Sequence, residues 1–70
     1  MRNIIREVRD KKGLSQTEVA EAVKVSRQTI HSIETGKFIP STVLALKFAR
    51  LFQMQVEDLF SLNDEDEAER

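Results

Sequence analysis

The sequence predicts a single all-α domain built from five short helices. Of its 70 residues, 40% are hydrophobic and 33% are charged, with only two glycines and one proline, a balance typical of a helical protein. Nowhere do Val, Ile and Thr alternate with polar residues long enough to form a regular strand. Because domains commonly have about 100–150 residues, we expect one domain over 1–62 and a disordered acidic tail over 63–70.

The first two helices are marked by capping residues. Asn3 can cap a helix over 4–12, and Gly13 suits the left-handed backbone that ends such a helix. The stretch 15–18 has the S-x-x-E form of a capping box. It predicts a second helix over 16–23.

The third helix is short and mostly polar. Ser26 is placed to cap it over 27–35, and Gly36 suits its end. Its only apolar residues, Ile30 and Ile33, stand three positions apart and therefore lie on one narrow stripe. The other side chains of this helix are expected to face outward.

The fourth helix is more apolar than so short a chain can cover. Ser41 caps it over 42–52, where eight of eleven residues are apolar, and a short fifth helix follows over 56–60. Part of its surface is therefore expected to contact a second copy of the chain. Core positions are expected at Leu46, Phe48, Ala49 and Phe52. The candidate dimer interface consists of Val43, Leu44, Leu51, Phe60 and Leu62.

The charge is divided between the body and the tail. Residues 1–60 carry a net charge of +3 and residues 61–70 carry −4, so the overall value of −1 conceals a mildly basic body. The tail is either a solvated end or a segment that repels DNA or contacts a partner. The absence of cysteine, of a signal peptide and of a long apolar run predicts a cytoplasmic protein without a membrane partner.

Catalysis has no support in the sequence. His31 is the single histidine, cysteine is absent, and neither a Gly-rich phosphate loop nor a Ser/His/Asp set can be assembled. The acidic residues 64–67 lack the glycine and the distal Glu of a calcium loop. We therefore expect no enzymatic activity, cofactor or metal, and no small-molecule ligand is evident.

Two of the predicted helices have the spacing of a helix-turn-helix. The segments 16–23 and 27–35 are separated by a turn of three residues. The second of these helices presents Arg and Gln, which can make bidentate contacts to guanine and adenine in the major groove, and the amides at both helix starts suit phosphates. The alternative is that this polar face is only the outer face of a surface helix.

Four segments resemble the Cro/cI, or XRE, class of bacterial and phage helix-turn-helix regulators: SQTEVA at 15–20, VSRQTI at 25–30, IETGK at 33–37 and PS at 40–41. The resemblance runs from Asn3 to Phe60 and is strongest to the compact stand-alone members. It implies a five-helix lambda-repressor-like fold that binds double-stranded DNA as a homodimer.

The resemblance also implies roles for individual residues. Arg27, at the start of its helix, is placed either to read a base or to hold a phosphate, and Ser26 is expected to cap the helix. The base-reading positions correspond to Arg27, Gln28, His31 and Ser32. The phosphate-contacting positions correspond to Gln16, Thr35 and Lys37.

Three structural features accompany the resemblance. Glu34 stands in the last turn of its helix, where the helix dipole disfavours a negative charge, and the family places a cation at Arg9, which implies an Arg9–Glu34 ion pair. Lys24 occupies a turn position that is commonly Gly in this class because the backbone there is left-handed. A short strand pairing of 1–3 with 60–62 is compatible with a compact dimer of this kind.

The function implied is sequence-specific transcriptional regulation, more often repression, at a palindromic operator. A dimer would place two third helices in successive major grooves about 34 Å apart. The alternative is an antitoxin whose apolar fourth helix and tail bind a toxin and whose DNA binding is autoregulatory. The lack of a long disordered extension favours the regulator.

Overall fold

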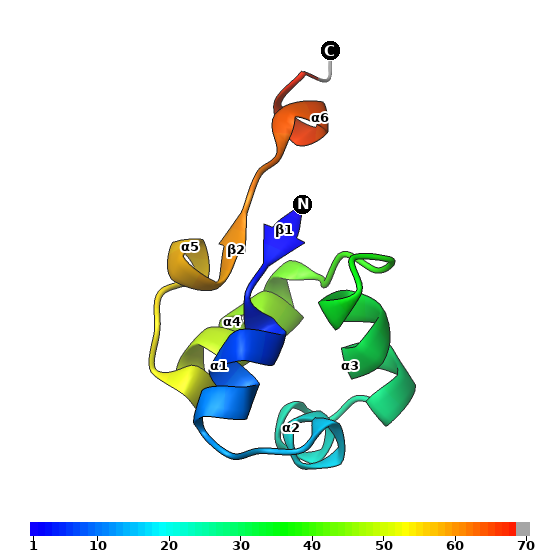
Figure 1. Ribbon diagram of the computed structural model, residues 1–70, viewed down its shortest axis with the longest axis vertical. Helices are drawn as coiled ribbons and strands as arrows, with labels where there is room; N and C mark the ends of the chain where they lie inside the picture. The colour runs from blue at the N-terminus through cyan, green and yellow to red at the C-terminus, as the bar shows by residue number, and fades with distance from the viewer. Residues whose placement is uncertain (69–70) are drawn as a thin grey trace.

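The computed structural model describes residues 1–68, which form six helices and a two-stranded sheet (Figure 1). These residues measure 37 × 22 × 20 Å along their principal axes, and α6 stands apart from the helical body. The all-helical fold predicted from the sequence is confirmed. In chain order the elements are β1 (Arg2–Asn3), α1 (Ile5–Lys11), α2 (Gln16–Val23), α3 (Arg27–Glu34), α4 (Thr42–Phe52), α5 (Val56–Leu59), β2 (Phe60–Ser61) and α6 (Asp64–Glu67).

The predicted serine caps are confirmed. Ser15 Oγ accepts a hydrogen bond from the Glu18 amide at 3.0 Å, and Glu18 Oε1 accepts one from the Ser15 amide at 2.8 Å, which completes the capping box of α2. Ser26 and Ser41 accept from the third residues of α3 and α4 in the same way, each at 3.1 Å. These caps fix where the three helices begin.

The first helix begins one residue later than expected. Ile4 occupies the cap position, and α1 runs from Ile5 because Asn3 belongs to β1. Asn3 still serves the helix, since its Oδ1 accepts a hydrogen bond from the Ile5 amide at 3.1 Å, while its Nδ2 donates to the Ile33 carbonyl at 2.9 Å. This side chain therefore joins the start of α1 to the end of α3.

Two non-glycine residues end helices in the left-handed conformation. Lys24 has φ 65° at the end of α2, as its position in the turn predicts, and Gln53 has φ 56° at the end of α4. Gly36 has φ 82° after α3. A side chain in this region costs about 1 kcal/mol relative to glycine, so both non-glycine caps are strained.

One hydrophobic core lies between the helices. The rings of Phe48 and Phe52 are stacked with centroids 6.2 Å apart, and Phe60 tilts against Phe48 at 6.1 Å. Every element from α1 to β2 contributes to the cluster. Its buried members are Ile5, Val8, Val19, Ala20, Val23, Ile30, Ile33, Leu44, Phe48, Phe52, Leu59 and Phe60.

Two leucines of α4 lie on the opposite face from the one predicted. Leu44, expected at a dimer interface, is buried in the core, and Leu46, expected in the core, is 57% exposed. The reason is helical phase: Leu44 stands four and eight residues before the stacked Phe48 and Phe52, so these three share the inward face. Phe60 is likewise buried rather than available to a partner.

The remaining interface candidates differ in exposure. Val43 is 64% exposed and Leu62 is 59% exposed, whereas Leu51 is half-buried and packs against the core. Ala49, expected in the core, also packs against it while half-buried.

The two ends of the domain are joined by a short sheet. β1 and β2 pair antiparallel, with Arg2 opposite Ser61 and Asn3 opposite Phe60. The Ile4 amide extends the contact by donating to the Leu59 carbonyl at 3.0 Å. The strand pairing expected between the terminal segments is confirmed.

The acidic tail, which was predicted to be disordered, contains a helical turn. α6 begins with a capping box in which Asn63 Oδ1 accepts from the Asp66 amide at 2.9 Å and Asp66 Oδ2 accepts from the Asn63 amide at 3.0 Å. The Met1 ammonium lies 2.9 Å from Asp66 Oδ2. The last two residues of the predicted tail, 69 and 70, lie outside the described residues.

Candidate nucleic-acid interface

The turn between α2 and α3 sets the angle at which α3 leaves the body. Lys24 reverses the chain, and the Val25 amide closes the turn with a 3.0 Å bond to the Ala20 carbonyl. Ile30 and Ile33 are fully buried and anchor α3 to the core, which leaves its opposite face to solvent. In Figure 1, α3 lies at the edge of the body, away from α5.

The outward face of α3 carries the four predicted base-reading residues. Arg27, Gln28 and His31 are exposed, and Ser32 is half-buried. Gln28 and Ser32 are one helical turn apart and line a shallow groove of about 260 Å³, together with Lys37 from the following loop.

The other predicted site residues gather at a second groove. Its volume is about 390 Å³, and its walls come from α1, α2, α3 and the residue that follows α3. Three of its residues are arginines and one is glutamate, a balance that favours anions. The lining residues are Arg6, Arg9, Gln16, Arg27, His31, Glu34 and Thr35.

Arg9 and Glu34 are brought together as the resemblance implied. Arg9 Nε lies 2.7 Å from Glu34 Oε2, and Nη2 lies 3.3 Å from Oε1, so the contact is bidentate. Arg9 Nη1 also donates to the Leu14 carbonyl at 2.9 Å. The hydrogen bond to Glu34 raises the pKa of Arg9, and burial opposes this rise. The pair holds α1 against the end of α3.

Gln16 extends this ion pair toward the outward face of α3. Its Nε2 donates to Glu34 Oε1 at 3.0 Å, and its Oε1 accepts from Arg27 Nη1 at 3.2 Å. Because a carboxylate can only accept, Glu34 fixes which end of the amide faces Arg27. His31 Nδ1 lies 3.4 Å from the same Nε2. Five residues of three helices are thus linked in one chain of polar contacts.

Thr35 and Lys37 differ in how free their side chains are. The Thr35 hydroxyl is 3.0 Å from the His31 carbonyl and 3.2 Å from the Ser32 carbonyl, so its single proton is directed to the backbone of α3. A donor contact to phosphate would require that hydroxyl to turn. Lys37 is exposed and its ammonium needs no such change.

Two residues of this surface, Arg6 and Phe38, were not predicted from the sequence. Arg6, whose side chain is 73% exposed, lines the larger groove from α1, and Phe38 lines the smaller one. Arg6 stands one turn before Arg9, so helical spacing could have found it. Phe38 follows Lys37 in a loop and carried no periodic signal.

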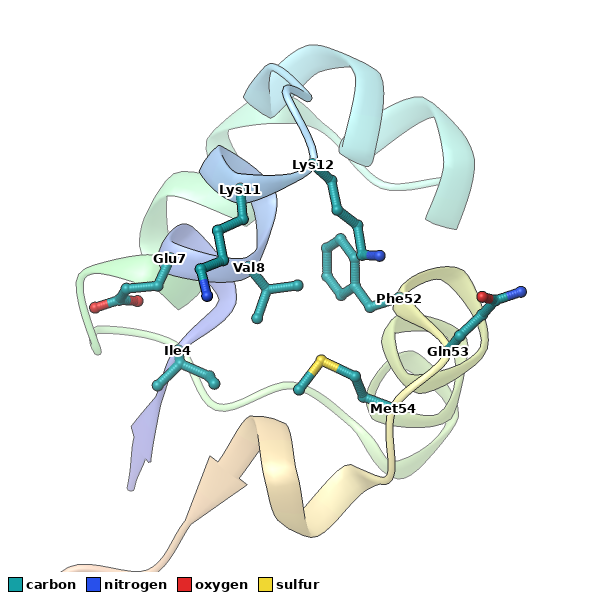
Figure 2. A pocket seen from close by; sticks show the side chains of 8 residues that line it. All are labelled: Ile4, Glu7, Val8, Lys11, Lys12, Phe52, Gln53 and Met54. Atoms are coloured by element: carbon teal, nitrogen blue, oxygen red, sulfur yellow. The ribbon is translucent and has the colours of Figure 1, made fainter.

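A larger groove lies elsewhere and contains none of the predicted site residues. It measures about 610 Å³ between α1 and the end of α4. Figure 2 shows Lys11 and Lys12 reaching across an apolar floor of Ile4, Val8, Phe52 and Met54.

Within residues 1–68, His, Asp and Glu side chains do not gather in groups of three or more that could hold a metal ion. No helix in the same part of the chain is both long and apolar enough to cross a membrane.

Two packed helices, a turn of three residues and a polar outward face on the second helix define a helix-turn-helix protein. The HTH_3 family model, described as helix-turn-helix, matches residues 5–59. The chain therefore belongs to the helix-turn-helix family of XRE type, whose members are DNA-binding transcriptional regulators rather than enzymes.

Individual relatives cover almost the whole chain. An uncharacterised HTH-type transcriptional regulator of Methanothermobacter thermautotrophicus is 51% identical over 69 residues, which span 97% of this chain and 99% of that protein. YgzD of Bacillus subtilis, described in the same words, is 44% identical over 66 residues, or 94% of this chain and 100% of that protein.

A solved structure shows the same fold. The restriction-modification controller protein C.AhdI from Aeromonas hydrophila is similar with a TM-score of 0.74 and 34% sequence identity, over 80% of this chain and 85% of that one. The lambda-repressor-like arrangement implied by the resemblance is therefore confirmed.

Proposed function

We propose that this regulator binds a palindromic operator in double-stranded DNA as a homodimer and represses transcription. The observation that carries the proposal is the outward face of α3, where Gln28 and Ser32 stand one turn apart on a helix anchored by buried isoleucines. Glutamine can make two hydrogen bonds to one adenine in the major groove. Because its partner is genomic DNA, we place the protein in the cytoplasm. Its relatives are described as transcriptional regulators, so the antitoxin alternative is not favoured.

The proposed contacts divide into those that read bases and those that hold the backbone. Gln28 and Ser32 read bases with His31 beside them, whereas Arg27 either reads a base or, drawn toward Gln16, holds a phosphate. Backbone contacts are proposed for Gln16, Thr35 and Lys37. Lys37 is the strongest of these candidates, because the amide of Gln16 and the hydroxyl of Thr35 already donate within the chain.

The proposed dimer uses the outer face of α4. Ile39 and Leu46 line an apolar groove of about 310 Å³, and Val43 stands beside Leu46 on a neighbouring one. The exposed fractions of these three side chains lie between 57% and 64%. A two-fold axis through this face would bury the same residues of both copies, as a symmetric dimer requires.

The test is selection of bound duplexes from a random pool, followed by titration of the selected duplex against salt. We expect a palindrome with half-sites one helical turn apart. Gln28→Ala with Ser32→Ala should abolish the enrichment. Gln55→Ala is the matched control, because Gln55 is exposed and its side chain makes no cap bond. Binding only at low salt without an enriched sequence would overturn the proposal.

A further inference from the structure

Phe38 is an exposed aromatic residue beside the base-reading face. Half of its surface is accessible, and it lines the same groove as Gln28, Thr29 and Ser32 of α3. The buried core contains three other phenylalanines, and Phe38 is outside it. An apolar ring therefore lies next to the polar side chains that are proposed to contact bases.

The backbone holds this residue against α3. The amides of Lys37 and Phe38 both donate to the Ser32 carbonyl, at 2.9 Å and 3.1 Å. The left-handed backbone of Gly36 turns the chain back toward α3. The Gly36 amide also donates to the Ile33 carbonyl at 3.0 Å. Because the loop is tied to α3, Phe38 is held beside Gln28 and Ser32.

The major groove offers one apolar group to such a ring. The C5-methyl of thymine projects there, and aromatic or small apolar side chains contact it. We infer that Phe38 reads the C5-methyl group of a pyrimidine next to the base contacted by Gln28 and Ser32, and that it is a specificity-determining residue. The inference rests on the proposed operator binding. Thymine and 5-methylcytosine carry the same methyl group, so the chemistry is shared by both bases.

The experiment replaces each thymine of the selected operator in turn by deoxyuridine, which removes only the methyl group. At one position in each half-site we expect affinity to fall about fourfold, the value of burying one methyl group. Phe38→Ala should bind the two duplexes equally. Phe38→Leu should keep the preference for thymine, since leucine retains an apolar contact.

Two controls make the result specific. Ile4→Ala should keep the fourfold difference, because Ile4 is also an exposed apolar residue but does not line this groove. A cytosine placed at the sensitive position should gain affinity when its C5 is methylated. A gain shows that the methyl group, rather than the thymine base as a whole, is read.

The inference is overturned if the wild type tolerates deoxyuridine at every position or if the preference survives in Phe38→Ala. It is also overturned if cytosine methylation has no effect at a position sensitive to deoxyuridine. Failure to enrich any operator is a different result, because it overturns the proposed function and this inference with it.

Discussion

Arg9 is the residue on which the geometry of the interface depends most. The Glu34 side chain is only 3% exposed, and Arg9 supplies its bidentate partner. Removing one member of a buried pair leaves an uncompensated charge, so Arg9→Ala should lower the free energy of unfolding by about 3 kcal/mol. Urea denaturation measures this change in the free energy of unfolding. Arg9→Lys should lose less, because it keeps the charge but not the bidentate contact. An unchanged midpoint for Arg9→Ala would contradict a stabilising pair.

Lys24 is strained by its left-handed backbone, with φ 65°. Lys24→Gly should be neutral or stabilise the protein by up to about 1 kcal/mol. Gly36→Ala is the opposite case, because a Cβ placed at φ 82° has open space around it but the same backbone strain, and it should destabilise. Chemical denaturation of both variants compares them directly. A clear loss for Lys24→Gly would show that the lysine side chain stabilises the turn.

The helix α4 carries core residues on one face and the proposed dimer contact on another. Leu46→Glu should convert the proposed dimer to a folded monomer, since Leu46 is 57% exposed and its replacement leaves the core intact. Leu44→Ala should instead lower stability by about 2–4 kcal/mol through loss of buried volume while leaving the dimer contact surface unchanged. Sedimentation equilibrium and thermal melting distinguish the two. A dimer that persists in Leu46→Glu would place the interface elsewhere.

The α6 turn should depend on pH through Asp66. The hydrogen bond from the Asn63 amide, and secondarily the contact with the Met1 ammonium, hold the pKa of Asp66 below its usual range. A lowered folded-state pKa gives stability that is present above the unfolded value of about 3.9 and is lost as pH falls through the folded value. The amide shifts of Asn63 and Asp66 should report this transition in acid. Asp66→Asn should abolish it, and Glu65→Gln should leave it unchanged.

Across the whole molecule, the features that the sequence could predict are those set by interactions between residues close together in the chain. The serine caps and the capping box at Ser15 depend on neighbours within a few residues, and all are present. The left-handed backbone of Lys24, which the family resemblance implied, is present as well. The helix-turn-helix follows from these signals and from its spacing. The sequence did not predict the cap of α6, although Asn63 and Asp66 have capping-box spacing, because a run of like charges more often stays extended and solvated.

What sequence could not decide depends on long-range packing. Apolar residues lie on nearly all sides of α4, so the sequence does not show which of them face the core. Leu44, expected at the dimer interface, is therefore buried, and Leu46, expected in the core, is exposed. The contact between Gln16 and Arg27 joins residues eleven apart through side chains, and no periodicity reports it. The position of Phe38 follows from two backbone bonds to one carbonyl of α3, which only the folded loop defines.

The acidic turn α6 and the helix α2 are separated by the length of the molecule. In Figure 1, α6 and α2 lie at opposite ends of the longest axis, which measures 37 Å. At 0.15 M salt, charges are screened beyond about 8 Å, whereas at 0.01 M the screening length is about 30 Å. The charge of −4 on α6, Asp64–Glu67, can therefore oppose DNA binding only when salt is low.

Deleting residues 64–70 should accordingly leave operator affinity unchanged at 0.15 M salt and raise it at 0.01 M. Replacing the acidic side chains by Gln and Asn at the same length is the matched control, because it removes the charge without shortening the chain. Fluorescence titration at both salt concentrations measures the effect. If affinity rose equally at 0.15 M, the tail would have to reach the DNA face, and the separation seen between α6 and α2 would not persist in the bound state. If it rose at neither, the tail would be only a solvated end.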